Sequence, residues 1–299
     1  MCSACRARIR ALPETEEHVT SSSKPFEEWI GRQTTSEDVL TERLDASFRA
    51  IFGPNLAASP KGQAPAGIHW CLSPAIAPMD ELGGDGHPAR NKDMPPVPAP
   101  RRMWAGGTVE TLAPLYVGDR VTRVSTIADI ARKEGRTGEL WFVTIDHEYR
   151  TQRGIAVRDR QNIVYREAAT SQAPAKHAAP GQENRAIAAS WTVPTSSVLL
   201  FRYSAISFNG HRIHYDAPYA TGVEGYDGLV VHGPIQATLL LNLAASQTGS
   251  TPVRFTYRGT APAIAGTDLL VCRGSGDPAK FWTQSPAGLI HMEASVEAA

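Results

Sequence analysis

The feature that most constrains the fold of this chain is a long apolar run that follows His232-Gly233-Pro234. Glycine can cap a helix, and proline suits a first helical position because its missing N–H would have no partner there. Apolar residues then recur at three-to-four-residue spacing, at Ile235, Leu239, Leu240 and Leu243. A helix with such an apolar side is stable only when that side is covered. We therefore expect a buried helix over residues 234–245.

A polar segment precedes this helix, and it holds side chains suited to proton transfer. Residues 209–234 include three of the nine histidines of the chain. Because the ordinary pKa of histidine lies near neutrality, His211 and His214 are candidates for general acid-base catalysis. A helix start beside them would present backbone N–H groups and a partial positive charge to a developing oxyanion. We expect the N–H of Gly233 to be that oxyanion donor.

Other interpretations of these residues stay open at this level. A single histidine is most often a hydrogen-bonded structural residue. A metal site with His211, His214, Asp216 and His232 as ligands is chemically reasonable, because imidazole and carboxylate suit zinc or iron. The spacing matches none of the short zinc motifs, so we expect no metal. Arg212 is either a surface charge or a residue that binds an anionic substrate.

Composition and charge argue against several classes of function. The chain carries 30 basic and 30 acidic side chains and no long basic run. A nucleic-acid partner is therefore not expected. No apolar stretch approaches the ~20 residues that a membrane-spanning helix needs. The first residues lack the apolar centre of a signal peptide, and four cysteines are too few for a disulfide framework. These features favour the cytoplasm.

The cysteines themselves give little functional signal. Cys2 and Cys5 form a C-x-x-C pair without a second pair, and we interpret them as incidental thiols. Cys71 and Cys272 are expected to be buried apolar residues.

The first half of the chain has signals for one helix and a sheet. Thr35-Ser36 before two acids indicates a helix start, and Gly53-Pro54 is expected to end that helix. Residues 73–100 are rich in proline and glycine, and we expect them to form a surface loop that borders a binding cleft. Segments rich in β-branched and aromatic residues predict antiparallel strands over residues 106–112, 120–133, 140–152 and 154–167.

The second half repeats this plan. A strand is expected over residues 198–207, followed by the polar segment, the helix, and strands over residues 253–260, 268–274, 279–285 and 289–297. The predicted division is a flexible N-terminus over 1–28, a first half over 29–167, a linker over 168–190 and a second half over 191–299. The combination of Asn209, His214 and Gly233 has no match in the first half. The first half is therefore expected to be non-catalytic.

One segment resembles a known family. Its sequence, Tyr-Ser-Ala-Ile-Ser-Phe-Asn-Gly-His-Arg-Ile-His-Tyr-Asp, covers residues 203–216. Together with Gly-Leu-Val-Val-His-Gly-Pro over residues 228–234, it is similar to the active-site region of the MaoC-like hotdog-fold hydratases. The subgroup with the Phe-Asn-x-His-Arg-Ile-His-Tyr-Asp signature includes the mesaconyl-C4-CoA and itaconyl-CoA hydratases and the mitochondrial type 2 hydroxyacyl-thioester dehydratases. A weaker similarity extends from Trp29 to the C-terminus.

The resemblance implies a fold and a set of catalytic residues. The fold is a double hotdog, an α+β arrangement in which two antiparallel sheets, each wrapped around a central helix, join edge to edge. The catalytic aspartate and histidine of the broader family fall on Asn209 and His214, and the oxyanion donor falls on Gly233. Asparagine cannot take a proton. The resemblance thus implies that Asn209 orients the water while His214 acts as base and acid, or that His211 shares this work.

The expected activity is reversible hydration of an enoyl-CoA thioester by a hydro-lyase. CoA enters as part of the substrate, and no metal or redox cofactor is expected. We expect substrate contacts from His211, Arg212, Tyr215 and His232. A free carboxylate on the acyl group, as in mesaconyl-C4-CoA or itaconyl-CoA, is expected to pair with Arg212 or with an arginine of residues 73–102.

Two rival functions and one structural question stay open. The first rival is a hotdog acyl-CoA thioesterase. The second is a non-catalytic acyl-CoA-binding subunit, which is considered because an asparagine stands at the aspartate position. A double hotdog can also pair into a homodimer, and the sequence does not decide whether it does.

Overall fold

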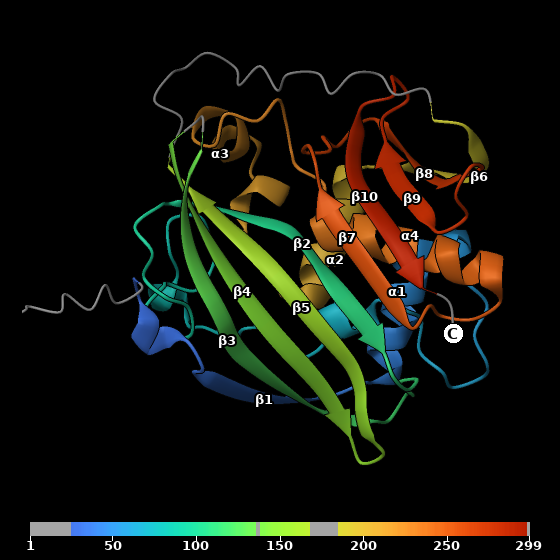
Figure 1. Cartoon of the computed structure of the whole chain (residues 1–299), viewed down its shortest axis with the longest axis horizontal. Coiled ribbons are helices and arrows are strands. Elements are labelled where there is room, and N and C mark those ends of the chain that lie inside the picture. The colour runs from blue at the N-terminus through green and yellow to red at the C-terminus, as the bar shows by residue number, and fades with distance from the viewer. Residues whose placement is uncertain (1–24, 136–137, 168–184, 298–299) are drawn as a thin grey trace, which may run out of the picture.

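A computed structural model describes residues 25–135, 138–167 and 185–297 of the chain. Its ten strands form one antiparallel sheet in the order β1-β3-β4-β5-β2-β7-β10-β9-β8-β6 (Figure 1). The strands of the first half are β1 (Gln33–Val39), β2 (Arg101–Thr111), β3 (Arg120–Gly135), β4 (Gly138–Thr151) and β5 (Gly154–Arg166). Those of the second half are β6 (Ile187–Pro194), β7 (Arg254–Gly259), β8 (Asp268–Gly274), β9 (Lys280–Gln284) and β10 (Ile290–Glu297).

The two halves of the sheet have the same strand order. The order is 1-3-4-5-2 in the first half and 6-8-9-10-7 in the second, so each strand has its counterpart five strands later. The halves meet where β2 pairs with β7, with Gly106 opposite Arg258 and Glu110 opposite Arg254. A Cβ on Gly106 would lie 2.6 Å from the carbonyl oxygen of Tyr257, so the close approach of these strands requires glycine. Two antiparallel sheets joined edge to edge were predicted, and the structure confirms them.

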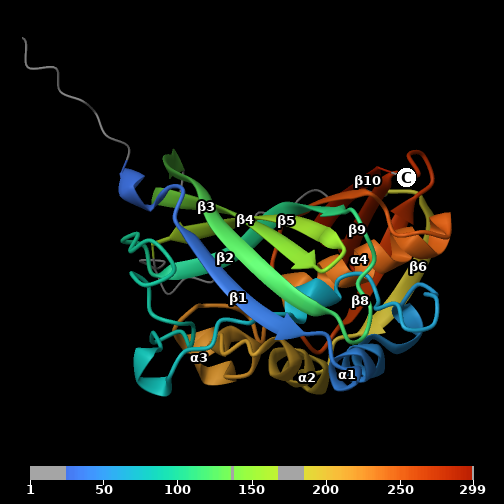
Figure 2. The ribbon, with the colours of Figure 1, turned by 90° about the horizontal axis from the view of Figure 1, so that it is seen from below.

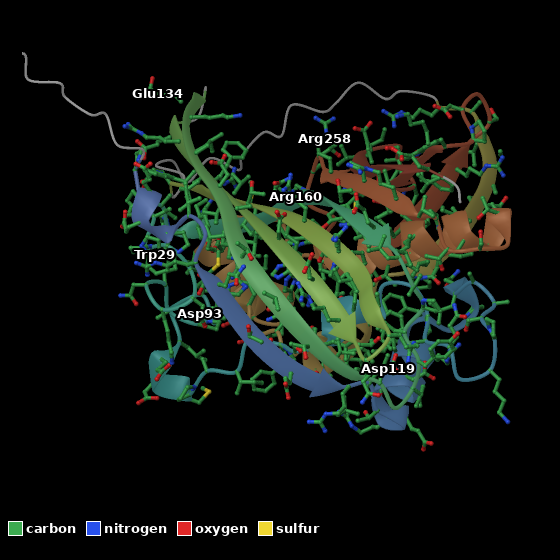
Figure 3. All side chains as sticks on the ribbon, turned by 60° about the horizontal axis from the view of Figure 1, so that its bottom comes forward. Trp29, Asp93, Asp119, Glu134, Arg160 and Arg258 are labelled. Atoms are coloured by element: carbon green, nitrogen blue, oxygen red, sulfur yellow. The ribbon has the colours of Figure 1, made fainter. Side chains whose placement is uncertain are left out.

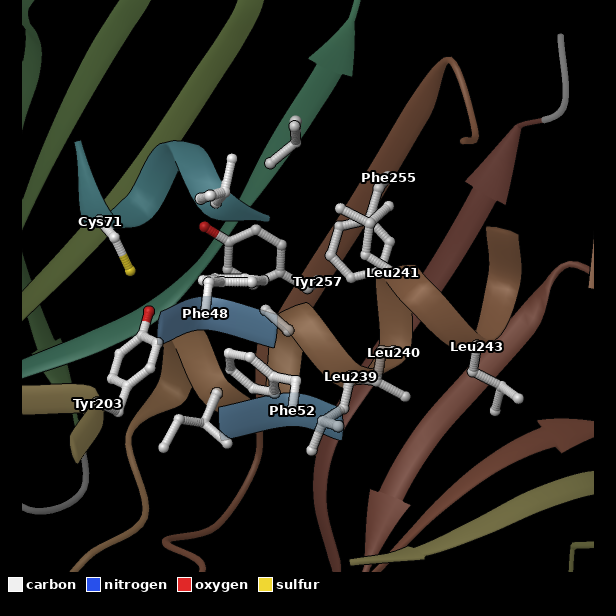
Figure 4. Packing of buried hydrophobic residues seen from close by; sticks show 14 of the residues in the cluster. Phe48, Phe52, Cys71, Tyr203, Leu239, Leu240, Leu241, Leu243, Phe255 and Tyr257 are labelled. Atoms are coloured by element: carbon white, nitrogen blue, oxygen red, sulfur yellow. The ribbon is translucent and has the colours of Figure 1, made fainter. Parts of the chain in front are cut away.

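The helix α4 (Gly233–Thr248) is the central helix of the second half. Every residue from Ile235 to Ala245 in it is buried, because the second-half strands pack against it. Its apolar side chains form part of one cluster with α1 and β7 (Figure 4). In that view Leu239 and Leu240 lie beside Phe52, and Leu241 lies beside Phe255. The prediction of a buried helix over residues 234–245 is confirmed, with three further residues at its C-terminal end.

The helix of the first half begins later than predicted. Residues around Thr35 form strand β1, which pairs with β3 along its whole length. The helix α1 (Glu42–Phe52) instead starts after Thr41, whose hydroxyl accepts a hydrogen bond from the N–H of Leu44. The predicted start was wrong because Thr35-Ser36 followed by acids imitates a cap, while the true cap lies six residues further on.

Residues 198–207 form a helix and not the predicted strand. The helix α2 (Ser197–Ser207) is capped by Ser196, whose hydroxyl accepts from the N–H of Leu199. Its β-branched and aromatic residues favour a strand locally, but the cap and packing against α1 decide for a helix. The helices α1, α2 and α3 (Ala217–Gly222) lie in a row beneath the sheet in Figure 2.

The remaining segments agree with the predictions in part. Of the nine strands other than β1, eight match the predicted segments to within about five residues at each end, and the ninth, β6, was left unassigned by the sequence. It begins at Ile187, inside the range predicted as linker, and η1 (Glu27–Trp29) begins inside the predicted flexible N-terminus. Residues 1–24 and 168–184 of these two ranges lie outside the described residues. Cys71 and Cys272 are buried, as expected.

The outer face of the sheet is charged. Arg160 pairs with Asp146 at 2.7 Å, and Arg258 pairs with Glu293 at 2.8 Å (Figure 3). On β7 the alternate residues Phe255 and Tyr257 are buried on the side of α4. No helix of the described residues is long and apolar enough to cross a membrane.

Candidate active site

A cavity of about 1520 Å³ contains the predicted catalytic residues. Asn209, His214 and Gly233 all line it, and so do residues of β2, β3, β4 and β5 from the first half. In the described part of the first half, the longest helix is α1, and it packs against α2. The inner face of the first-half sheet therefore borders this cavity, whereas α4 covers the inner face of the second-half sheet.

His214 is held in one tautomer. It ends the short helix η5 (Arg212–His214), and only 7% of its surface is exposed. Its Nδ1–H donates to the carbonyl oxygen of Val230 at 2.7 Å, so Nε2 carries the free lone pair of the neutral ring. Burial lowers the pKa of His214 to about 4. The imidazole is neutral at pH 7 and can act as a base through Nε2.

His232 supports His214 from behind. The two rings stack with centroids 3.5 Å apart and planes 15° apart. The Nε2 atom of His232 is hydrogen-bonded to the Ser204 hydroxyl at 2.9 Å. His232 is fully buried and is not among the residues that line the cavity. This position gives no support to the predicted contact of His232 with substrate, and its ring packs directly on the plane of the His214 ring.

Gly233 opens α4 at the cavity wall. A Cβ at this position would lie 2.4 Å from Cε3 of Trp104, so only glycine fits. Trp104 is itself fixed by stacking on Tyr257, with centroids 4.5 Å apart. The first N–H groups of a helix have no acceptor inside that helix. The N–H of Gly233 thus combines access to the cavity with the positive end of the α4 dipole.

Asn209 and His211 lie beside His214. The side-chain oxygen of Asn209 accepts a hydrogen bond from the N–H of His211 at 3.0 Å. The ring of His211 meets that of His214 edge to face, with centroids 5.4 Å apart. The Nε2 atom of His211 is buried and forms no hydrogen bond with the described residues. Burial lowers the pKa of His211 far below its ordinary value, so this ring is also neutral.

The sequence did not reveal Asp85 and His87 as part of the site. Both the backbone N–H and the Nδ1 atom of His87 are hydrogen-bonded to the Asp85 carboxylate at 3.0 Å. The ring of His87 lies 4.3 Å from that of His211, centroid to centroid. Burial disfavours the Asp85 anion, but the two hydrogen bonds and the charge of His87, together with the charge of His211, outweigh burial, and the pKa of Asp85 lies well below its ordinary value.

A close contact between two glycines positions this aspartate-histidine pair at the site. Gly86 has a positive φ of 88°, and a Cβ there would lie 2.0 Å from the carbonyl oxygen of Gly210. The backbone of residues 73–100 therefore rests directly on the segment that carries the histidines. Asp-Gly-His was the available sequence signal, but nothing local says where such a loop docks.

Two of the four side chains considered as metal ligands are engaged with other residues. Asp216 is paired with Arg212, and His232 is hydrogen-bonded to Ser204. A different group, Asp85, His87 and His211, has potential ligand atoms within 4.8 Å of one another. Burial lowers the pKa of both of these histidines, and the charge of the Arg102 guanidinium lowers it further. A positive charge there disfavours a bound cation.

Two further predicted residues have different positions. Arg212 forms an ion pair with Asp216, with nitrogen-oxygen distances of 2.8 and 2.9 Å, and donates to the carbonyl oxygen of Gly84. It is not among the residues that line the cavity, so this position gives no support to its predicted contact with substrate. Tyr215 does line the cavity, and its hydroxyl donates to the carbonyl oxygen of Gly210 at 3.0 Å.

The first half also contains a buried polar cluster, which the sequence analysis did not anticipate. Asp159 accepts hydrogen bonds from Trp70 at 3.0 Å and from Gln161 at 2.6 Å. His69 lies 4.0 Å from the same carboxylate. Burial raises the pKa of Asp159 to about 7. His69 and Asp159 are not among the residues that line the cavity, whereas Trp70 and Gln161 are, so the buried carboxylate lies directly behind the cavity wall.

Comparison with known proteins identifies similar chains. The profile of a family described as hydroxyacyl-thioester dehydratase type 2 matches residues 67–265. A mesaconyl-C4-CoA hydratase of Chloroflexus aurantiacus is 38% identical over 279 residues, which cover 92% of this chain and 99% of the relative. A mitochondrial hydroxyacyl-thioester dehydratase type 2 of Saccharomyces cerevisiae is 24% identical over 287 residues, which cover 90% and 98%.

Solved structures with low sequence identity share the fold. A MaoC-like dehydratase from Phytophthora capsici has a TM-score of 0.64 at 15% identity, over 90% of this chain and 96% of that one. A Mycobacterium tuberculosis protein described as a double hotdog has a TM-score of 0.52 at 12% identity, over 89% and 96%. The predicted double hotdog is thereby confirmed.

Proposed function

Because the chain belongs to the hydroxyacyl-thioester dehydratase type 2 family, we propose that it is a hydro-lyase that adds water reversibly to an enoyl-CoA. The observation that carries this proposal is the convergence of two groups on one cavity. These are the His214 imidazole, with a free Nε2, and the Gly233 N–H at the start of α4. One can exchange a proton, and the other can stabilise negative charge.

The proposed reaction uses these groups in order. His214 Nε2 takes a proton from water while the water oxygen forms a bond to the β-carbon. The electron pair of the double bond moves toward the thioester carbonyl, and the enolate oxygen lies against the Gly233 N–H. The protonated His214 then returns the proton to the α-carbon, so that one water is consumed and the thioester stays intact. Loss of one oxyanion donor typically raises the barrier by about 3 to 4 kcal/mol.

Asn209 and His232 have supporting roles in this proposal. The side-chain oxygen of Asn209 is engaged with the N–H of His211, and its amide NH₂ can donate to the attacking water. His232 keeps the His214 ring in place by stacking. Imidazole and backbone dipoles suffice for the charge changes of the proposed reaction, so it requires no metal or redox cofactor.

The proposed substrate is a short branched dicarboxylic acyl-CoA, such as mesaconyl-C4-CoA or itaconyl-CoA. Support comes from the 38% identity to the Chloroflexus aurantiacus enzyme named for the first of these. The cavity volume of about 1520 Å³ exceeds the usual 300–1,000 Å³ of small-molecule sites, which fits an acyl group together with part of the CoA chain.

The test is a substrate panel of short branched dicarboxylic and straight-chain enoyl-CoAs, with absorbance and free thiol recorded together. The proposal predicts loss of enoyl absorbance without release of CoA. Release of CoA from a saturated acyl-CoA would favour a thioesterase instead. Binding without either reaction would favour a non-catalytic acyl-CoA-binding subunit.

A further inference from the structure

Arg102 is a cation without a partner at the edge of the proposed active site. It lies on β2 opposite Tyr165 and lines the cavity. Its side chain is half-buried and forms no ion pair or hydrogen bond with any residue that the structure describes. Removing a guanidinium from water without giving it an acceptor is costly. Such a group is expected to meet an anion that enters from outside the protein.

Some of the other cations near the cavity are already engaged. Arg32 donates to the carbonyl oxygen of Glu28 at 2.9 Å, whereas the Nε atoms of Arg123 and Arg166 are buried without a hydrogen-bond partner among the described residues. Lys92 pairs with Glu81 at 2.9 Å. The neighbour of Arg102 on β2, Arg101, pairs with Glu224 at 3.3 Å. Among the described residues that line the cavity, Arg102 shares the lack of an ion-pair partner with Arg123 and Arg166, and its distinguishing feature is its place on β2 close to Trp104.

The position of Arg102 relates it directly to the reacting atoms. Arg102 and Trp104 are two residues apart on β2, about 7 Å along the strand and on the same face. Trp104 in turn touches Gly233, the proposed oxyanion donor. Arg102 is thus the next residue on that face of β2 after Trp104, which packs where the thioester carbonyl would lie.

Two imidazoles share this part of the cavity with Arg102. Burial lowers the pKa of both His87 and His211, and the Arg102 charge lowers it further. His87 is held by Asp85, while Nε2 of His211 is buried without a partner. A neutral histidine in the Nε2–H tautomer would offer one more donor to an anion. The Asp85 carboxylate is occupied by both donors of His87.

We propose that Arg102 is the specificity-determining residue of the site and binds a free carboxylate of the substrate acyl group, with His211 as a second donor. This inference rests on the proposed function. In a substrate such as mesaconyl-C4-CoA the carboxylate is attached to the β-carbon, which must lie close to His214, and His211 lies directly beside that ring. Guanidinium binds carboxylate through two parallel hydrogen bonds, which lysine cannot reproduce.

The test compares substrates that share CoA but differ in the carboxylate. For Arg102→Gln, kcat/KM with mesaconyl-C4-CoA is expected to fall about 10- to 100-fold or more, because a hydrogen-bonded charge is lost. With crotonyl-CoA the change is expected to stay within about threefold. Arg102→Lys should show a smaller but equally selective loss. Arg258→Gln, which removes an exposed guanidinium of the neighbouring strand β7, is the matched control and should change neither value.

A binding measurement separates this inference from the proposed function. Succinyl-CoA and butyryl-CoA differ in a terminal carboxylate, and wild-type protein is expected to bind succinyl-CoA more tightly. Arg102→Gln and Arg102→Lys should each reduce this preference. Equal losses of affinity for both ligands would overturn the inference, because the anion bound by Arg102 would then be a CoA phosphate. Unchanged affinity for both ligands would also overturn it. Failure of the wild-type protein to hydrate any enoyl-CoA would contradict the proposed function, even if the protein binds succinyl-CoA more tightly than butyryl-CoA.

Discussion

The Nδ1 atom of His214 lies 2.7 Å from the carbonyl oxygen of Val230. A carbonyl oxygen can only accept a hydrogen bond, so Nδ1 must carry the ring proton. The lone pair is then at Nε2, and the stacked ring of His232 prevents the imidazole from turning away. One main-chain contact thus sets both the tautomer and the orientation of the proposed base.

The pH dependence of the reaction should reflect this buried base. Burial lowers the pKa of His214 to about 4, and only the neutral ring can take a proton from water. We therefore expect kcat/KM for hydration to stay level from about pH 8 to about pH 5 and to fall as the pH drops through about 4. A steady-state profile measures this, with circular dichroism at each pH to confirm folding. A midpoint near the ordinary value of 6.5 would show that the base is not this buried histidine.

A methyl group at position 233 should disturb both structure and rate. The Cβ of Gly233→Ala would lie 2.4 Å from Trp104, and such overpacking costs about 1 to 3 kcal/mol of unfolding free energy. The displaced N–H should also lower kcat by about 10- to 1,000-fold. Urea unfolding and initial rates test the two effects. Adding Trp104→Leu should restore stability to Gly233→Ala, and the clash is not the cause if stability does not recover.

The buried carboxylate of Asp159 should make the fold less stable at neutral pH than at acid pH. Burial raises its pKa to about 7, above the ordinary 3.8, so its contribution to stability is present below pH 3.8 and is lost as the pH rises through 7. The loss in unfolding free energy is of the order of 4 kcal/mol. Asp159→Asn keeps an oxygen for the Trp70 and Gln161 hydrogen bonds and should remove this loss.

Urea unfolding of wild type and Asp159→Asn at pH 5 and pH 8 measures the effect. The free energy of unfolding of Asp159→Asn, relative to that of wild type, is expected to be higher at pH 8 than at pH 5. Asp80→Asn changes an exposed acid and should show no such gain. The same difference in stability at both pH values for Asp159→Asn would mean that Asp159 is ionised throughout.

The sequence predicted those parts of the fold that local patterns determine. The helix α4 has apolar residues at three-to-four-residue spacing, and the long strands β3, β4 and β5 are rich in β-branched residues, so both kinds of element were found from composition and spacing. The helix α2 was missed because Val198, Phe201 and Tyr203 favour a strand, and the deciding signal was a single cap at Ser196. Helix α1 was misplaced for a related reason, since two capping patterns lie six residues apart.

The candidate site was predictable only where its residues are close together in the chain. Asn209, His214 and Gly233 lie within one segment, and all three line the cavity. Asp85, Arg102 and Trp104 come from more than 100 residues earlier in the chain. They reach the site through the pairing of β2 with β7 and the contact of Gly86 with Gly210. Such long-range contacts leave no periodic signal in the sequence.

The most direct test of the central claim is the rate at which His214→Gln hydrates mesaconyl-C4-CoA, measured as loss of enoyl absorbance with the thioester intact. Glutamine retains a donor for the Val230 carbonyl oxygen but cannot exchange a proton at neutral pH. The account predicts a kcat about 100- to 10,000-fold below that of wild type, with thermal unfolding little changed. A folded His214→Gln protein that hydrates this substrate at the wild-type rate would contradict it.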